Sequence, residues 1–405
     1  ANPTDENVHA GAARLRALLK QPHFGDDRLL LLVRTERAPL LDDINDRGNH
    51  FTGAFLPSLR ASRAIDSVIA ESGGRIALAA PYFTADEHDR MTRDWVLFKV
   101  HCMADAGSPT GGWLQFVPSV QLAAAAHGLG VPMSVVSPAP AEADTRTPCR
   151  VFPADAEPAA LGLKAEQVRE ELNAALYGPQ GEGGAVEAYW ARLQRAFNQR
   201  LRADGRELGA LPEAHSLGNR IVYRYRWGGA PDEDLSTGRV QRRPAREVLD
   251  AVASGDARLA LSMSQLFAGR TVVIGQTFRE ANDVFYTPVG TMPGAAVLVN
   301  AIDSMREYQL LRATGGALSN TIALVLIVVV GYLFARWDST TGTITATAIV
   351  ILSVGVASFF MFQHGVWLDV AAPILGIQLH RLWAGWEERQ ELKARRAATG
   401  DAHHH

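Results

Sequence analysis

The chain has 405 residues, 47% of them hydrophobic, so it can bury a sizeable core and exceeds one ordinary domain. Its 40 Lys and Arg residues nearly balance 43 Asp and Glu residues, and the net charge of −3 gives no broad attraction for nucleic acid. The composition therefore excludes a disordered chain and argues against a nucleic-acid-binding protein. His403, His404 and His405 resemble the remnant of a purification tag.

Strand and helix patterns alternate in the first part of the chain. Residues Arg28 to Thr35 and Arg75 to Phe83 hold continuous apolar runs, and helical spacing lies between them from Ala61 to Ile69. Residues Val120 to Ser137 repeat the scheme as a short helix, a glycine stop and a third strand. The pattern predicts an α/β domain with a mainly parallel sheet.

Two further patterns follow in the next hundred residues. Leu163 to Leu208 has a helical period interrupted by a Gly-rich stretch, which predicts a helical hairpin, inserted at about 163–208. Arg220 to Trp227 alternates apolar and polar residues, which predicts a half-exposed strand. Arg224 and Arg226 share one face of that strand. They are candidates for an anion contact, and a solvated or salt-bridged face is the alternative.

A polar loop follows an apolar run near residue 275. Val272 to Gly275 predicts a strand, and the loop after it contains Asp283 and ends at Thr287 and Pro288. Asp283 either caps the amides of its own loop or touches a ligand. Pro288 fixes the exit from the loop and disfavours helix before it. We interpret the loop as a structural corner.

Three apolar stretches begin at Ala317 and end near Trp383. Each has about the ~20 residues that cross a bilayer, so the sequence predicts three transmembrane helices over residues 314–384. Arg389, Lys393 and other basic residues of the tail place residues 385–405 in the cytoplasm and residues 1–313 outside it. Because Ala1 begins no export signal, we expect a leader or anchor that was cleaved or that precedes this stretch.

The chain's reactive side chains form no convincing catalytic set. Cys102 and Cys149 have neither zinc nor redox spacing, so one disulfide or two buried thiols are the alternatives. His101 and Cys102 are neighbours on a strand and so point to opposite faces. We therefore expect no metal, no cofactor and no enzymatic activity.

Residues Gly269 to Met305 resemble the C-terminal signature of CHASE2 domains, which are extracytoplasmic sensor modules of bacterial receptors. The signature has an apolar strand ending in Gly, a loop Asp, Thr-Pro, Pro-Gly and an Asn-Ala helix. Its elements here are listed in chain order: Val272 to Gly275, Asp283, Thr287-Pro288, Pro293-Gly294 and Asn300-Ala301. The resemblance implies a sensor domain followed by membrane helices. CHASE2 receptors usually continue into a cyclase or kinase, and we expect that output module to be absent here.

Two classes of function remain. The first is a stand-alone sensor that relays an extracytoplasmic signal to a separate cytoplasmic kinase or cyclase. The second is a non-catalytic CHASE2-like subunit of an envelope complex, which binds a ligand or protein outside the cytoplasmic membrane and acts through other envelope proteins or by self-association. The expected lack of an output module favours the second class. Neither class identifies a small-molecule ligand.

Overall fold

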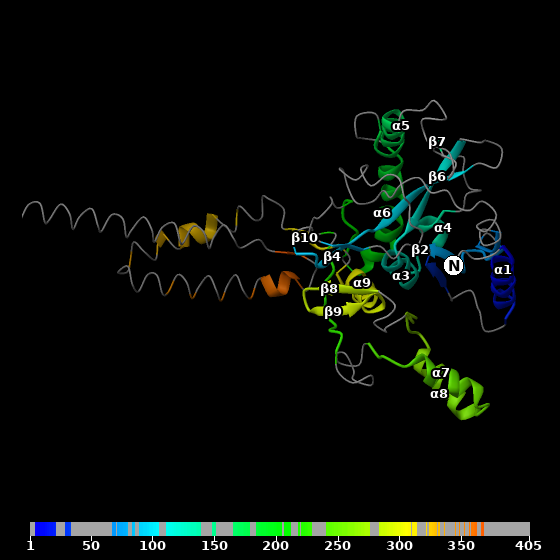
Figure 1. The fold of residues 1–405 in the computed structure, drawn as a ribbon. Coiled ribbons are helices and arrows are strands. Elements are labelled where there is room, and N and C mark those ends of the chain that lie inside the picture. The colour runs from blue at the N-terminus through cyan, green and yellow to red at the C-terminus, as the bar shows by residue number, and fades with distance from the viewer. Residues whose placement is uncertain are drawn as a thin grey trace, which may run out of the picture. The chain divides into compact units, whose positions relative to one another are not determined.

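The computed structural model describes residues 5–21, 29–33, 67–69, 71–79, 83–85, 89–104, 111–138, 148–150, 165–178, 184–204, 206–211, 218, 220–228, 240–275, 283–308 and 310–313, with separate residues from 321 to 367. The chain divides into two compact units, Ala1–Leu310 and Leu311–His405. Figure 1 shows the elements of the fold.

A parallel strand pair opens the sheet structure of the first unit. Strand β1 (Leu30–Val33) pairs in parallel with β2 (Ile76–Ala79), and Leu30 lies opposite Ile76. Residues 67–69, between the two strands in sequence, are helical. The strand–helix–strand order that the apolar runs predicted is therefore present. Ala12 of α1 (Asp5–Leu19), a helix that we did not predict, packs with Val68 and Ile76.

The remaining sheets of the first unit are antiparallel, so the prediction of a mainly parallel sheet is wrong. Short connections explain the hairpins among them, because a parallel crossover needs about a dozen residues or more, whereas a hairpin needs only a few. Only Pro288 and Val289 separate the last two strands. The antiparallel strands are listed by sheet: β3 (Phe83–Ala85) with β4 (Thr92–Trp95); β5 (Phe98–Ala104), β6 (Gly111–Pro118) and β7 (Pro148–Arg150); β8 (Val284–Thr287) with β9 (Gly290–Pro293).

Three segments that we predicted as strands have another structure. The third strand, expected before Ser137, is helix α4 (Met133–Val136), which begins after Pro132. The segment from Arg220 to Trp227 forms a single bridge between Arg220 and Asp94. Val272 to Gly275 belongs to no strand. Apolar or alternating residues in short runs do not identify a strand unless a neighbouring backbone pairs with them.

The predicted helices are present elsewhere in the first unit. Helix α3 (Val120–Gly128) begins at Ser119, whose hydroxyl accepts a hydrogen bond from the Leu122 amide at 3.3 Å. The predicted hairpin consists of α5 and α6. Its helices and the remaining ones are listed here: α5 (Ala165–Tyr177), α6 (Ala185–Leu201), the 3-10 turn η3 (Arg202–Asp204), α7 (Ala245–Ala253), α8 (Ala257–Phe267) and α9 (Gly294–Glu307).

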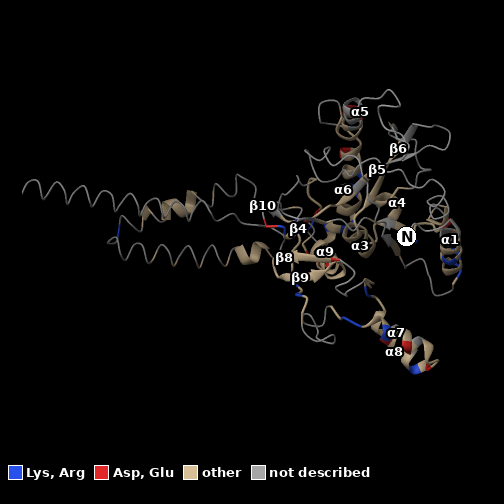
Figure 2. Ribbon diagram, viewed as in Figure 1, with Lys and Arg blue, Asp and Glu red and all other residues tan. Residues whose placement is uncertain are grey.

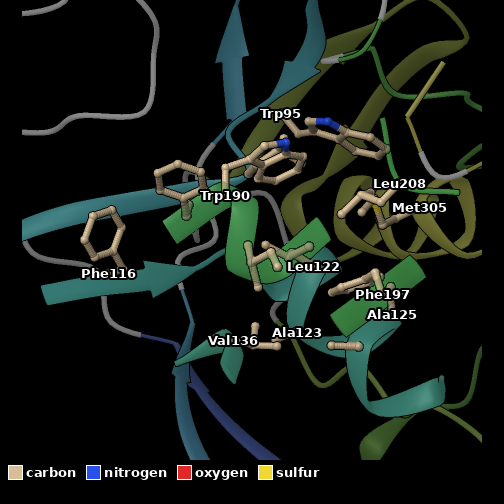
Figure 3. Close-up of a cluster of buried hydrophobic side chains, with 14 of the residues drawn as sticks. Trp95, Phe116, Leu122, Ala123, Ala125, Val136, Trp190, Phe197, Leu208 and Met305 are labelled. Carbon is tan, nitrogen blue, oxygen red and sulfur yellow. The ribbon is translucent and has the colours of Figure 1, made fainter. Parts of the chain in front are cut away.

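The main core joins the β5–β6 hairpin to α3, α6 and α9. Figure 3 shows labelled core side chains from these elements, including Phe116, Leu122, Trp190 and Met305. The rings of Phe98 and Tyr189 meet edge to face, with 4.9 Å between their centroids. Because β-strands and helices from distant parts of the chain share this cluster, it holds α9 in place within the unit.

The prediction of three transmembrane helices is contradicted. Within the residues that the structure describes, no helix combines the length and apolar character that crossing a bilayer requires. Val366 and Trp367, expected to begin the third span, form strand β11 and pair in parallel with β10 (Arg312–Ala313). A β-branched and an aromatic residue are both common in strands, so this pairing suits them. Most of the expected third span, residues 368–383, lies outside the described residues.

Candidate functional site

The residues of the CHASE2-like signature lie in helix α9 or in the segments that lead into it. Thr287 and Gly290 face each other across the turn of the β8–β9 hairpin, and Pro288 lies between them. The Thr287 hydroxyl donates a hydrogen bond to the Gly290 carbonyl. Gly290 has a φ of 117°, a conformation that favours glycine. Thr287 and Pro288 therefore form a hairpin turn, and the hairpin delivers the chain to α9.

Close packing surrounds the first turn of α9. A Cβ added at Gly275 would lie 2.5 Å from the Cβ of Ala295, and a Cβ at Gly294 would overlap the carboxylate of Asp283. The Gly294 amide also donates to the Asp283 carbonyl at 3.0 Å. Asp283 thus lies at the amino end of α9, where the helix dipole favours a negative charge. Both glycines are needed for close approach.

Asn300 is the polar centre of α9, and its side chain is only 1% exposed. Its Oδ1 accepts hydrogen bonds from the amides of Arg224 and Tyr225, at 2.9 and 3.0 Å. Its Nδ2 donates to the carbonyls of Tyr225 and Ala296, at 3.1 and 3.0 Å. An amide side chain offers two donors and one acceptor with two lone pairs. All of that capacity is used within the protein, so Asn300 supports the fold and has none left for a ligand.

Two neighbours of Asn300 on the same helix face extend the contact. Ser304 Oγ accepts a hydrogen bond from the Val222 amide at 3.1 Å. Asp303 forms a salt bridge with Arg224 at 3.3 Å. Burial is the largest single influence and opposes the charged form of Arg224, but Asp303, together with Tyr308, Tyr225 and Glu307, raises the pKa of the guanidinium overall. Both arginines are exposed, and Arg224 is held by the Asp303 carboxylate.

The other edge of the 220–227 segment contacts β4. The Ile221 amide donates to the Arg93 carbonyl at 2.7 Å, and the Tyr223 hydroxyl donates to the Thr92 carbonyl at 2.8 Å. Burial, and then the nearby Asp94 carboxylate, raise the pKa of Tyr223. The segment therefore lies between β4 and α9, and hydrogen bonds on both sides replace the ladder of a continuous strand.

Arg206 holds the carboxyl end of α9. Its guanidinium donates to the carbonyl of Arg306 at 3.3 Å and to that of Glu307. The last carbonyls of a helix have no partner within the helix, and a cation there also complements the helix dipole. The residues after Arg206 are tied to α6, since Trp190 and Gln194 both donate to the Gly209 carbonyl. Arg206 thus links the α5–α6 hairpin to α9.

A disulfide lies in the strands beyond this cluster. Cys149 of β7 is disulfide-bonded, and Cys102 of β5 is the only other cysteine of the chain. Strands β5 and β7 both neighbour β6 in one sheet. This sheet is separate from the β8–β9 hairpin that leads into α9.

We call the set Arg206, Asp283, Gly294, Asn300, Asp303 and Ser304 the α9 support. The sequence singled out Asp283 and Asn300, and it singled out Arg224, which Asp303 binds. It missed Arg206, Asp303 and Ser304. Ser304 could have been found, because Asn300, Asp303 and Ser304 recur at the spacing of one helix face. Arg206 lies about a hundred positions from its partners, and no sequence signal connects them.

The fold and this cluster define a mixed α/β domain organised around one supported helix. Residues 40–334 match the family model of the CHASE2 domain. The match covers more than half of the 405 residues, and the chain belongs to the CHASE2 family. CHASE2 domains are extracytoplasmic sensor modules, which fits a sensory role and an extracytoplasmic location for this domain. No curated protein and no solved structure matched the chain.

Proposed function

We propose that the protein is a non-catalytic CHASE2 sensor that binds a ligand or another protein outside the cytoplasmic membrane. It acts through partner proteins, as a subunit of an envelope complex. The observation that carries this proposal is the α9 support, whose polar side chains are engaged in holding a helix. We infer that α9 is the element that a bound ligand displaces, because three separate parts of the chain contact it.

Helix α9 is held at three levels, each from a different part of the chain. Asp283 lies at its first turn, the 220–227 segment at its middle and Arg206 at its last turn. A ligand that moves any of these would shift the helix, provided that it binds the two arrangements with different affinity. The first compact unit ends at Leu310, three residues after α9. We infer that α9 passes the shift to the residues that follow it.

The proposal can be tested by cross-linking in intact cells that carry the full chain, followed by mild extraction and mass spectrometry of the bound proteins. We expect envelope proteins in stoichiometric amounts. Arg206→Ala should reduce their recovery by about fivefold or more, because the last turn of α9 loses its contact with the hairpin. Arg202→Ala removes the same charge from an exposed position four residues earlier and should have no effect.

Two other results would change the conclusion. A cytoplasmic kinase or cyclase in stoichiometric amounts would replace the envelope subunit with the alternative, a stand-alone sensor that relays its signal to that enzyme. Recovery of no protein other than further copies of this chain would overturn the proposed action through partners.

A further inference from the structure

The segment Thr271–Gly275, called the 271–275 segment below, has an unusual backbone. None of the hydrogen bonds of the described residues involves the backbone of these five residues. Backbone N–H and C=O groups are almost always paired in folded proteins, with protein or with water. The sequence Thr-Val-Val-Ile is also rich in the β-branched residues that favour strands. The segment therefore has the composition of a strand, and no strand partner for it lies among the described residues.

The side chains of the 271–275 segment alternate as those of a strand do. Val273 packs against a cluster that includes Leu31 of β1 and Ala79 of β2. Val272 and Ile274 point the other way and are 51% and 90% exposed. At the end of the segment, Gly275 lies against Ala295 of α9. One face of the segment is thus fixed on the core, its outer face is exposed, and its backbone has no hydrogen-bond partner within the described part of the chain.

We propose that the 271–275 segment pairs with the same segment of a second copy of this chain, in antiparallel orientation about Val273. A twofold axis at Val273 would place Val272 of one copy opposite Ile274 of the other. The two exposed apolar side chains of each copy would then be covered by those of its partner. The backbone groups of both segments would gain partners at the same time.

The charge pattern favours a copy of the chain over other partners. Across a twofold axis, a charged residue near the centre would face a like charge, which destabilises a strand pair. The sequence has no charged residue between Arg270 and Arg279. A lipid surface could cover Val272 and Ile274, but it offers no backbone groups to pair with the segment. A second uncharged strand would both cover Val272 and Ile274 and pair with the backbone of the segment.

The β8–β9 hairpin is the natural comparison within the same unit. Val284 and Tyr286 of β8 are also exposed apolar residues, and Figure 2 shows no charge on either strand. The backbone of β8, however, already pairs with β9 in continuous register. Exposed apolar side chains alone therefore do not single out the 271–275 segment. What singles it out is that its backbone has no partner among the residues that the structure describes.

The pairing can be tested with the purified full chain and two cysteine variants, Val272→Cys and Ile274→Cys. Opposed residues of antiparallel strands have Cα atoms about 4.5–5.5 Å apart, which is suitable for a disulfide. The proposed register predicts cross-linked dimers when the two variants are mixed, at a yield at least about fivefold above that of either variant alone. Val284→Cys mixed with Tyr286→Cys is the control and should not cross-link.

Sedimentation of the uncross-linked protein gives a second readout. A pairing of five residues buries less than the roughly 1,200 Å² of a stable interface, so we expect a weak, concentration-dependent dimer. Ile274→Lys should weaken dimerisation by at least about tenfold, because a charge would enter the pairing and face the apolar side chain of the partner. The fold should be unaffected, since this side chain is exposed.

Three outcomes would overturn the inference. The first is a monomer at every concentration with no cross-link. The second is an equal yield from the Val284 and Tyr286 control. The third is slow amide exchange in residues 271–275 that does not depend on protein concentration, which would mean that the segment pairs within its own chain. None of these results bears on the cross-linking test of the proposed function, so the two can fail separately.

Discussion

The middle of α9 and the 271–275 segment lie in the same stretch of family signature, yet they are opposite in character. At Asn300 every hydrogen-bonding group of the side chain has a partner inside the protein. In the 271–275 segment no backbone group has one among the described residues. The polar signature residue is thus part of the architecture, and the apolar signature residues reach the surface. A search for function that follows polar residues alone would examine the wrong side of this region.

The largest effect should come from removing Asn300. Asn300→Ala leaves the buried Tyr225 amide and carbonyl without their partners, and each unsatisfied group costs about 1–3 kcal/mol. We expect the free energy of unfolding to fall by about 3 kcal/mol or more, measured from the urea midpoint. Ile274→Ser is the matched change in the other region and should stay within about 0.5 kcal/mol. Equal losses of unfolding free energy in the two variants would mean that the middle of α9 and the 271–275 segment contribute equally to stability.

A smaller effect should follow from adding a methyl group beside Asp283. Gly294→Ala places a Cβ in the space of the Asp283 carboxylate, and overpacking of this kind costs about 1–3 kcal/mol. The double variant with Asp283→Ala should recover most of that loss, because the obstructing carboxylate is gone. Thermal unfolding of the two single variants and the double variant measures this coupling. Simple additivity of the two losses would show that Asp283 does not lie against the helix.

The smallest effect concerns alkaline pH. Burial raises the pKa of Tyr189 and of Tyr223, so the folded state keeps both protons at pH values where the unfolded chain, with a tyrosine pKa of about 10, loses them. Stability is therefore full below about pH 10 and declines as pH rises above it. Tyr223→Phe should make this decline shallower, measured from urea midpoints between pH 8 and 11.5. An unchanged slope would mean that Tyr223 does not contribute to it.

Local patterns in the sequence predicted local structure well. The apolar runs of β1 and β2 and the helical period of α5 and α6 each depend on residues close in the chain. The pairing of one strand with another, in contrast, depends on residues that are distant in the chain. The alternation from Arg220 to Trp227 correctly indicated which side chains face inward, since Ile221 and Tyr225 are buried while Arg224 and Arg226 are exposed. Its partner, however, is the side chain of a helix residue 75 positions away, and no periodicity encodes that pairing.

The errors have a common physical origin. Apolar length alone was taken to mean membrane spans, and apolar runs were taken to mean strands of a parallel sheet. Val366 and Trp367 form a strand because Arg312 and Ala313 pair with them. The candidate site was found only in part for the same reason. The sequence resemblance identified Asp283 and Asn300, but their roles depend on Gly294 and on the backbone of Tyr225.

The hydrogen bonds from Arg206 to the end of α9 go to the main-chain oxygens of Arg306 and Glu307. Most substitutions at positions 306 and 307 can therefore alter the charge and shape of this surface while keeping these two acceptors. Proline is the exception, because it lacks the N–H that the helix uses and disrupts the turn that holds these carbonyls. The surface at the end of α9 is thus free to change from one homologue to the next and to suit different neighbours. Arg206, in contrast, cannot be replaced without losing the guanidinium that donates these hydrogen bonds.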